Sequence, residues 1–252
     1  MTSDKQALMD PDSPEAFVDR EISWLGFARR VLAQVEDPEL QLLERVKFAG
    51  IMGMLHDEFF MKRVSGMKRR IRKKSKKLSL DGRTAEEQLE RCRRELVDQI
   101  DGLARVVRKE ILPALAEEGL PILDYDAVKE SEKVHLRQYF RDSVKPILTP
   151  LAVDAEHPFP FISNDALNLA VMVPVESNGH ERFVRIKVPD NRPRWVPVSS
   201  AGGFVPLEQV IAANLDLVFP TAPPKQVHLF RVTRGAEGER DQSAEFSEDE
   251  LQ

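Results

Sequence analysis

Between residues 14 and 145, apolar residues recur every three or four positions, which is the spacing of one face of an α-helix. Ser13 followed by Pro14 is typical of a helix start, because Ser caps the backbone and Pro fits the first turn. Proline and glycine then mark the points where helices end. The pattern predicts four helices, which run from Pro14 to Asp37, from about Glu39 to Lys74, from Thr84 to Gly119 and from about Ser131 to Val144.

The second and third predicted helices differ in how their apolar residues are placed. From Leu42 to Met67 the second helix is apolar on nearly all sides, which predicts burial on more than one side. The third begins with the capping pair Thr84 and Glu87, and Pro113 is expected to break or kink it. Its apolar residues follow near-heptad intervals, which favour antiparallel packing in a helical bundle.

After Pro146 the pattern changes to short apolar or alternating runs bounded by Pro, Gly and Asn, which predicts strands. The expected strands are Leu167–Val173, Arg182–Val188, Arg194–Val198 and Gln226–Val232, with a helix from Pro206 to Leu215 between the last two. We therefore predict an N-terminal antiparallel helical bundle over residues 1–119, followed by an α+β domain with a mostly antiparallel sheet over residues 120–252. The fourth helix is expected to pack on this sheet.

The end of the sequence resembles the start of another helix. Ser247 and Glu250 form a capping box, yet far fewer residues follow than the roughly 12–15 that an isolated helix needs. This favours a fragment of a longer protein, incomplete in its second domain. The alternative is an acidic, frayed tail, since seven acidic residues and one Arg lie between Glu237 and Glu250.

Composition narrows the function classes. Of the 252 residues, 42% are apolar and 31% charged, which is typical of a soluble globular protein. The net charge of −5 argues against general nucleic-acid binding, and the single cysteine excludes a disulfide scaffold or a Cys-rich zinc site. No apolar run is long enough to span a bilayer, and the first residues lack the apolar stretch of a secretory signal. A cytoplasmic location is therefore expected.

One segment is strongly basic, although the net charge of the whole chain is negative. From Lys62 to Lys77 there are ten Lys and Arg residues and no acid, and no aromatic residue that would stack on a base. One interpretation is a surface for phosphates or polyanions, formed by Arg69, Arg70, Lys73 and Lys74. The other is a solvated helix end, whose cations offset the helix dipole.

Asp57 and Glu58 lie in the most apolar part of the second predicted helix. They indicate either a polar site or a lid over a ligand, or else an ion pair that fixes helix register, with Glu58 four residues before Lys62. The five histidines show no metal-ligand spacing, and no phosphate-binding glycine loop or nucleophile motif is present. The chain therefore contains no complete catalytic constellation.

Several longer stretches resemble the bacterial polyphosphate kinase family. Those similar to its N-terminal domain are Asp19–Phe27, Arg30–Leu32, Leu43–Arg45, Lys47–Phe48 and Asp57–Phe60 with Arg63. Those similar to its middle domain are Pro146–Leu151, His157–Asn164, Leu167–Val171 and Phe230–Arg234. The matches occur in the family's order and cover nearly the whole chain.

The resemblance implies a reversible transfer of the terminal phosphate of ATP to inorganic polyphosphate, with Mg²⁺ and through a phosphohistidine. It implies that the helical domain forms one wall of the nucleotide site and that the middle domain contributes to a homodimer or higher oligomer. In this family the nucleophilic histidine and most phosphate-binding arginines lie in two further C-terminal domains. This chain alone is therefore expected to have no kinase activity.

One position departs from the family pattern. Where the family has an Asn that touches the nucleotide, this sequence has Leu55, which cannot make the hydrogen bonds of an amide. Either the adenine contact is apolar, or His56 substitutes for the Asn, or the wall is degenerate. Asp57, Glu58 and Arg63 match the family and are expected to shape the wall. The rival interpretations are a non-catalytic polyphosphate-binding or dimerisation module, and a degenerate product without function.

Overall fold

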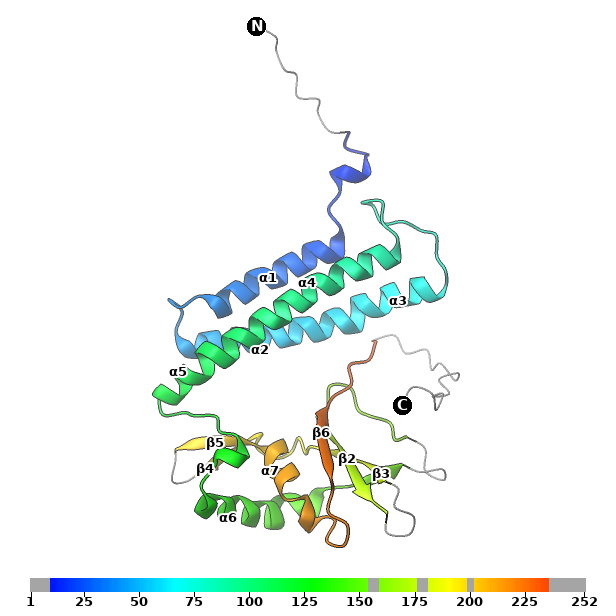
Figure 1. Ribbon diagram of the computed structural model, residues 1–252. Coiled ribbons are helices and arrows are strands. Elements are labelled where there is room, and N and C mark those ends of the chain that lie inside the picture. The colour runs from blue at the N-terminus through cyan, green and yellow to red at the C-terminus, as the bar shows by residue number, and fades with distance from the viewer. Residues whose placement is uncertain (1–9, 154–158, 176–180, 199–201, 236–252) are drawn as a thin grey trace. The chain divides into compact units, whose positions relative to one another are not determined.

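The computed structural model describes residues 10–153, 159–175, 181–198 and 202–235 (Figure 1). The predicted capping box at Ser247 and the acidic tail lie outside these residues, as does His157 of the middle-domain motif. The chain forms two compact units, one comprising Met1–Leu40, Glu44–Leu103 and Thr233–Gln252, the other Gln41–Leu43 and Ala104–Val232. This division by packing falls after Leu103, inside the third predicted helix, and the domain boundary predicted at residue 119 stays a prediction.

The first helix of the helical unit, α1, spans Arg20–Glu36 and begins later than predicted. The predicted cap Ser13 makes no side-chain cap hydrogen bond, and Pro14–Ala16 form only a 3₁₀ turn that ends at the extended residue Phe17. Asp19 caps α1 instead, because its Oδ1 accepts hydrogen bonds from the backbone N–H groups of Glu21 (2.8 Å) and Ile22 (2.9 Å).

The second helical run consists of α2 (Leu42–Glu58), a π-helical segment (Phe59–Val64) and α3 (Ser65–Arg72). The prediction that it is buried on more than one side was wrong, since Leu43 is 64% exposed and Met54 is 72% exposed. An apolar residue does not have to be buried, and α2 carries more apolar residues than the bundle covers. The π-helical segment widens the helix beside the predicted nucleotide wall, and such segments are often found at functional sites.

The third run comprises α4 (Ala85–Val106), a π-helical segment (Val107–Ile111) and α5 (Leu112–Glu117). Its capping box is confirmed: Thr84 N–H donates to Glu87 Oε2 (2.8 Å) and Glu87 N–H to Thr84 Oγ1 (3.2 Å). The run passes Pro113 directly after the π-helical segment and ends before Gly119, whose φ of +79° suits a helix end.

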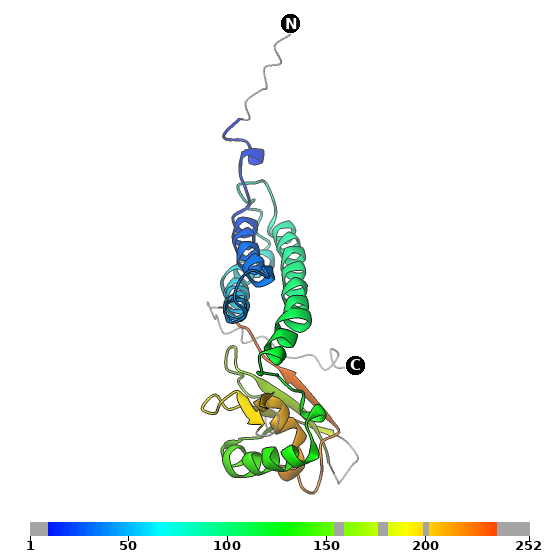
Figure 2. The ribbon, with the colours of Figure 1, turned by 90° about the vertical axis from the view of Figure 1, so that its left-hand side faces the viewer.

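The helices α1, α2–α3 and α4 lie side by side in both views of the ribbon (Figures 1 and 2). A buried apolar cluster joins them, and the ring of Trp24 packs at 5.2 Å from that of Phe59. The cluster consists of Leu25, Phe59, Val64, Met67, Cys92 and Leu96. The predicted helical bundle is therefore confirmed.

The second unit is built around an antiparallel sheet. Its strands are β1 (Leu151–Val153), β2 (Asn168–Pro174), β3 (Glu181–Lys187), β4 (Trp195–Val198), β5 (Gly203–Pro206) and β6 (Gln226–Phe230). Four strands pair in the order β1-β3-β2-β6, and β4 pairs with β5 in a separate ribbon. All these pairings are antiparallel, as predicted. The two short strands β1 and β5 were not predicted from the sequence.

Two helices complete the second unit. They are α6 (Glu130–Tyr139), which continues as a π-helical segment to Val144, and α7 (Leu207–Ala213). Phe140 shares one buried cluster with Val171 and Ile186 of the sheet, so the prediction that the fourth helix packs on the sheet is confirmed.

The structure assigns the cap of α1 to Asp19, which gives a first prediction. Asp19→Ala should lower the free energy of unfolding by about 1–2 kcal/mol, whereas Ser13→Ala should change it by less than about 0.5 kcal/mol. Thermal or urea unfolding of the 252-residue chain measures both. Equal losses for the two variants would contradict the assignment.

Candidate functional site in the helical unit

The predicted nucleotide-wall residues point in different directions from one helical run. Leu55 and Asp57 are half-buried, His56 is buried and Glu58 is exposed. Glu58 accepts a hydrogen bond from Lys62 Nζ at 2.8 Å, which confirms the predicted i,i+4 pair. This hydrogen bond, together with the charge of Lys62, holds the pKa of the Glu58 carboxyl below its usual value.

His56 makes its contact inside the bundle. Its Nε2 lies 3.3 Å from Oε1 of the fully buried Gln99, which also donates to the carbonyl oxygen of Leu25 at 3.0 Å. Burial lowers the pKa of His56, and the hydrogen bond with Gln99 and the charge of Asp57 offset only part of that effect. This inward orientation gives no support to the idea that His56 replaces the family Asn.

The helical unit contains a pocket of about 530 Å³ that is lined mostly by charged and polar residues, and we call it the basic pocket. Its walls are the start of α1, the run from Lys62 to Arg70, the segment from Lys77 to Asp81, and Gln88 of α4. Three of its lining residues are acidic: Asp19, Glu21 and Asp81. Twice as many are basic: Arg20, Lys62, Arg63, Arg69, Arg70 and Lys77. The pocket therefore attracts anions.

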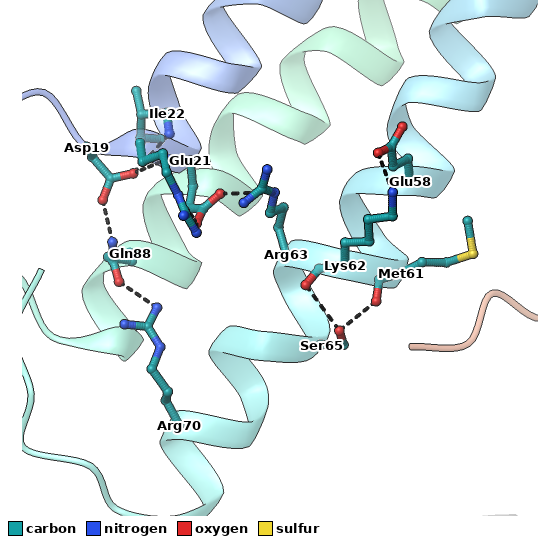
Figure 3. A network of polar contacts seen from close by, with 11 residues as sticks. Asp19, Glu21, Ile22, Glu58, Met61, Lys62, Arg63, Ser65, Arg70 and Gln88 are labelled. Atoms are coloured by element: carbon teal, nitrogen blue, oxygen red, sulfur yellow. Dashed lines mark hydrogen bonds and ion pairs between the residues drawn. The ribbon is translucent and has the colours of Figure 1, made fainter. Parts of the chain in front are cut away.

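Glu21 contacts two arginines from different helical segments at this pocket, Arg20 and Arg63, and Figure 3 shows its contact with Arg63. Its Oε1 accepts a hydrogen bond from Arg20 Nη2 at 2.9 Å. Its Oε2 lies 3.6 Å from Arg63 Nε, which is close enough for an ion pair but too long for a hydrogen bond. Oε2 is buried and accepts no hydrogen bond from the described residues.

A second chain of contacts runs from α1 through α4 to α3 (Figure 3). Gln88 Nε2 donates to Asp19 Oδ2, and Gln88 Oε1 accepts from Arg70 Nη2 at 2.8 Å. Burial acts to raise the pKa of Asp19, but the hydrogen bonds from Gln88, Ile22 and Glu21 outweigh it and hold that pKa below its usual value. Asp19 is therefore ionised at neutral pH.

The basic pocket brings together only some of the predicted site residues. Arg63, Arg69 and Arg70 line it, whereas Lys73 and Lys74 do not. Lys73 follows the last residue of α3, and Lys74 has a φ of +49°, so the chain turns away from the helix axis there. The pocket also contains residues that were not predicted from the sequence, namely Arg20, Glu21, Lys77 and Gln88, although the first two lie within the family-like stretch Asp19–Phe27.

The described residues contain no group of three or more His, Cys, Asp or Glu side chains placed to hold a metal ion. In the same part of the chain, no helix is both long and apolar enough to cross a membrane.

The fold defines a two-domain protein, a helical domain followed by an antiparallel α+β domain, and family models match both parts in that order. The polyphosphate kinase N-terminal domain matches residues 17–123, and the polyphosphate kinase middle domain matches residues 131–251. The chain belongs to the polyphosphate kinase family, which confirms the resemblance.

Individual relatives agree with the family models. A polyphosphate kinase of Mycolicibacterium gilvum is 42% identical over 239 residues, which cover 92% of this chain and 33% of the relative. One of Mycobacterium tuberculosis (strain H37Ra) is 41% identical over 247 residues, with the same coverage. A crystal structure of polyphosphate kinase from Porphyromonas gingivalis superposes with a TM-score of 0.77 at 26% identity, over 88% of this chain and 33% of that one. The chain thus spans about a third of the length of these relatives.

The tie between Glu21 and Arg63 gives a second prediction. Arg63→Ala leaves the buried Glu21 with one cation fewer and should lower the free energy of unfolding by about 1–3 kcal/mol. The matched control is Lys62→Ala, which removes the neighbouring cation from an exposed pair and should change stability far less. Chemical unfolding of both variants measures the difference, and a Lys62→Ala loss as large as that of Arg63→Ala would contradict the role of Glu21.

Proposed function

We propose that this chain forms the N-terminal and middle part of an enzyme that reversibly transfers the terminal phosphate of ATP to inorganic polyphosphate through a phosphohistidine. The observation that carries the proposal is the match of both domains, in order, to the polyphosphate kinase family. Relatives at 41–42% identity are named polyphosphate kinase, and they align with 92% of this chain.

Within that enzyme, the helical unit supplies one wall of the ATP site. The candidate residues are Leu55, His56, Asp57, Glu58 and Arg63, which all lie on the run from α2 through the π-helical segment. The half-buried Leu55 offers adenine an apolar contact where the family has an amide. His56 keeps that wall in place through Gln99.

Catalysis requires groups beyond those described here. Phosphoryl transfer needs a nucleophile, a metal ion and cationic clamps around the moving phosphate. The basic pocket offers cations of the kind that such clamps use, and the described residues contain no group of three or more His, Cys, Asp or Glu side chains placed to hold a metal ion. The cytoplasmic location and the homodimer or higher oligomer expected from the sequence stay predictions.

A second candidate is a non-catalytic polyphosphate-binding or dimerisation module. Two observations favour it: Leu55 stands at the family Asn position, and the basic pocket lies wholly within this chain.

A chimaera tests the proposed function. The 252-residue chain is fused to the remaining part of the Mycolicibacterium gilvum relative, in place of that protein's own N-terminal third. The chimaera should transfer phosphate from ATP to polyphosphate in an assay of ADP release, and the unfused chain should not. A folded but inactive chimaera, or transfer by the unfused chain, would contradict the proposal.

The nucleotide wall is tested in the same chimaera by Leu55→Asn. If residue 55 faces the adenine, the restored amide should lower the KM for ATP several-fold, because a hydrogen bond in a binding site contributes about 1 kcal/mol. The KM for polyphosphate should stay unchanged and serves as the internal control. An unaltered KM for ATP would show that residue 55 does not contact the nucleotide.

A further inference from the structure

Three cations on the wall of the basic pocket keep donors that the described residues do not use. Arg63 directs only its Nε toward Glu21, and Arg70 only its Nη2 toward Gln88. The Nζ of Lys77 has no ion-pair partner in the described part of the chain. A guanidinium carries five N–H donors, so both arginines can bind an anion without giving up their present contacts.

These contacts also fix the arginines in advance. Glu21 and Gln88 are buried and come from helices packed against the run that carries Arg63 and Arg70. Glu21 contacts the guanidinium group of Arg63, and Gln88 contacts that of Arg70 (Figure 3). Side chains that are already ordered lose less conformational entropy when they bind a ligand. The basic pocket is therefore preorganised for an anion, whereas a row of solvated lysines would have to be ordered on binding.

The acidic lining residues do not cancel this charge. Asp19 is covered by two backbone N–H groups and Gln88, and Asp81 is paired with Arg83. Glu21 Oε1 is paired with Arg20, and its buried Oε2, which accepts no hydrogen bond from the described residues, lies 3.6 Å from Arg63 Nε. The six basic side chains of the lining outnumber its three acidic ones, so the net charge of the lining stays positive.

The two arginines are placed along the helix and contact different partners. Arg63 and Arg70 are seven residues apart on one helical run, so their backbone positions are separated by about 10 Å at 1.5 Å per residue, and one contacts Glu21 and the other Gln88. One orthophosphate reaches only donors within about 3 Å of its oxygens. A chain of linked phosphates can contact both arginines together.

We propose that the basic pocket binds a condensed phosphate chain, the chemistry shared by polyphosphate and the triphosphate of ATP, through Arg63, Arg70 and Lys77. The choice of this ligand rests on the proposed function, whereas the pocket itself rests on the contacts above. The site lies within the helical unit and needs no residue of the second unit.

Calorimetric titration of the 252-residue chain with tripolyphosphate tests the site at about 50 and about 200 mM salt. Arg70→Ala should weaken binding about tenfold or more, because it removes a charged hydrogen-bond donor. Lys77→Ala should weaken it several-fold and serves as a second variant, since it leaves every described side-chain contact intact. Lys73→Ala removes the same charge from the same basic run, outside the pocket, and should change the affinity less than about twofold. Thermal unfolding of each variant checks its fold.

ATP, AMP and orthophosphate distinguish the sources of the ligand. If tripolyphosphate binds more tightly than ATP, the ligand of the pocket is polyphosphate. If the two bind equally, the pocket accepts any triphosphate chain. Both outcomes support the site. The proposed site would be overturned if Lys73→Ala and Lys77→Ala lost equal affinity for tripolyphosphate, or if orthophosphate bound as tightly as tripolyphosphate. If the chimaera is active but Arg70→Ala and Lys77→Ala bind tripolyphosphate as tightly as the unchanged chain, the proposed binding site is contradicted and the proposed function is not. If the chimaera is inactive but the titrations give the expected losses of affinity, the proposed function is contradicted and the binding site is not.

Discussion

Two carboxylates buried at the start of α1, Asp19 and Glu21, have to find donors inside the helical unit, and the arrangement of its polar residues follows from that constraint. Asp19 takes the backbone N–H groups that begin α1 and the side chain of Gln88 from α4. Glu21 accepts a hydrogen bond from Arg20 and forms an ion pair with Arg63. The apolar cluster brings three helical runs together, and these polar contacts fix how their ends meet.

The same contacts explain why the basic pocket lies where it does. Arg63 belongs to the π-helical segment and Arg70 to α3, and each is tied to a neighbouring helix. Because the ties use only part of each guanidinium, a stabilising contact and an anion-binding surface come from the same side chains. Stability and ligand binding are therefore coupled in this unit, and a ligand that binds only the folded state would stabilise it further.

Much of the fold was predictable, because helical periodicity and strand alternation are local properties of the sequence. What sequence reasoning missed depends on distant partners. Ser13 and Asp19 are both acceptable caps, and the choice of Asp19 is supported by Gln88, which is 69 residues away. Arg70 and Lys73 look alike in a basic run, yet only Arg70 meets a partner on α4. The exposure of Leu43 and Met54 could not be foreseen, because hydrophobicity alone does not say which face a neighbouring helix covers. The family motifs were recognisable from the sequence, whereas the pocket they form required the packing of α1 against the basic run.

The central claim is that two buried carboxylates at the start of α1 hold arginines in a site for linked phosphates, Glu21 by facing Arg63 directly and Asp19 through Gln88, which contacts Arg70. A crystal structure of the chain with tripolyphosphate tests it most directly. The account predicts one phosphate group on Arg63 and another on Arg70 within hydrogen-bond distance, with the contacts from Glu21 and Gln88 kept. Tripolyphosphate bound instead along Lys73 and Lys74, with no phosphate in the basic pocket, would contradict it.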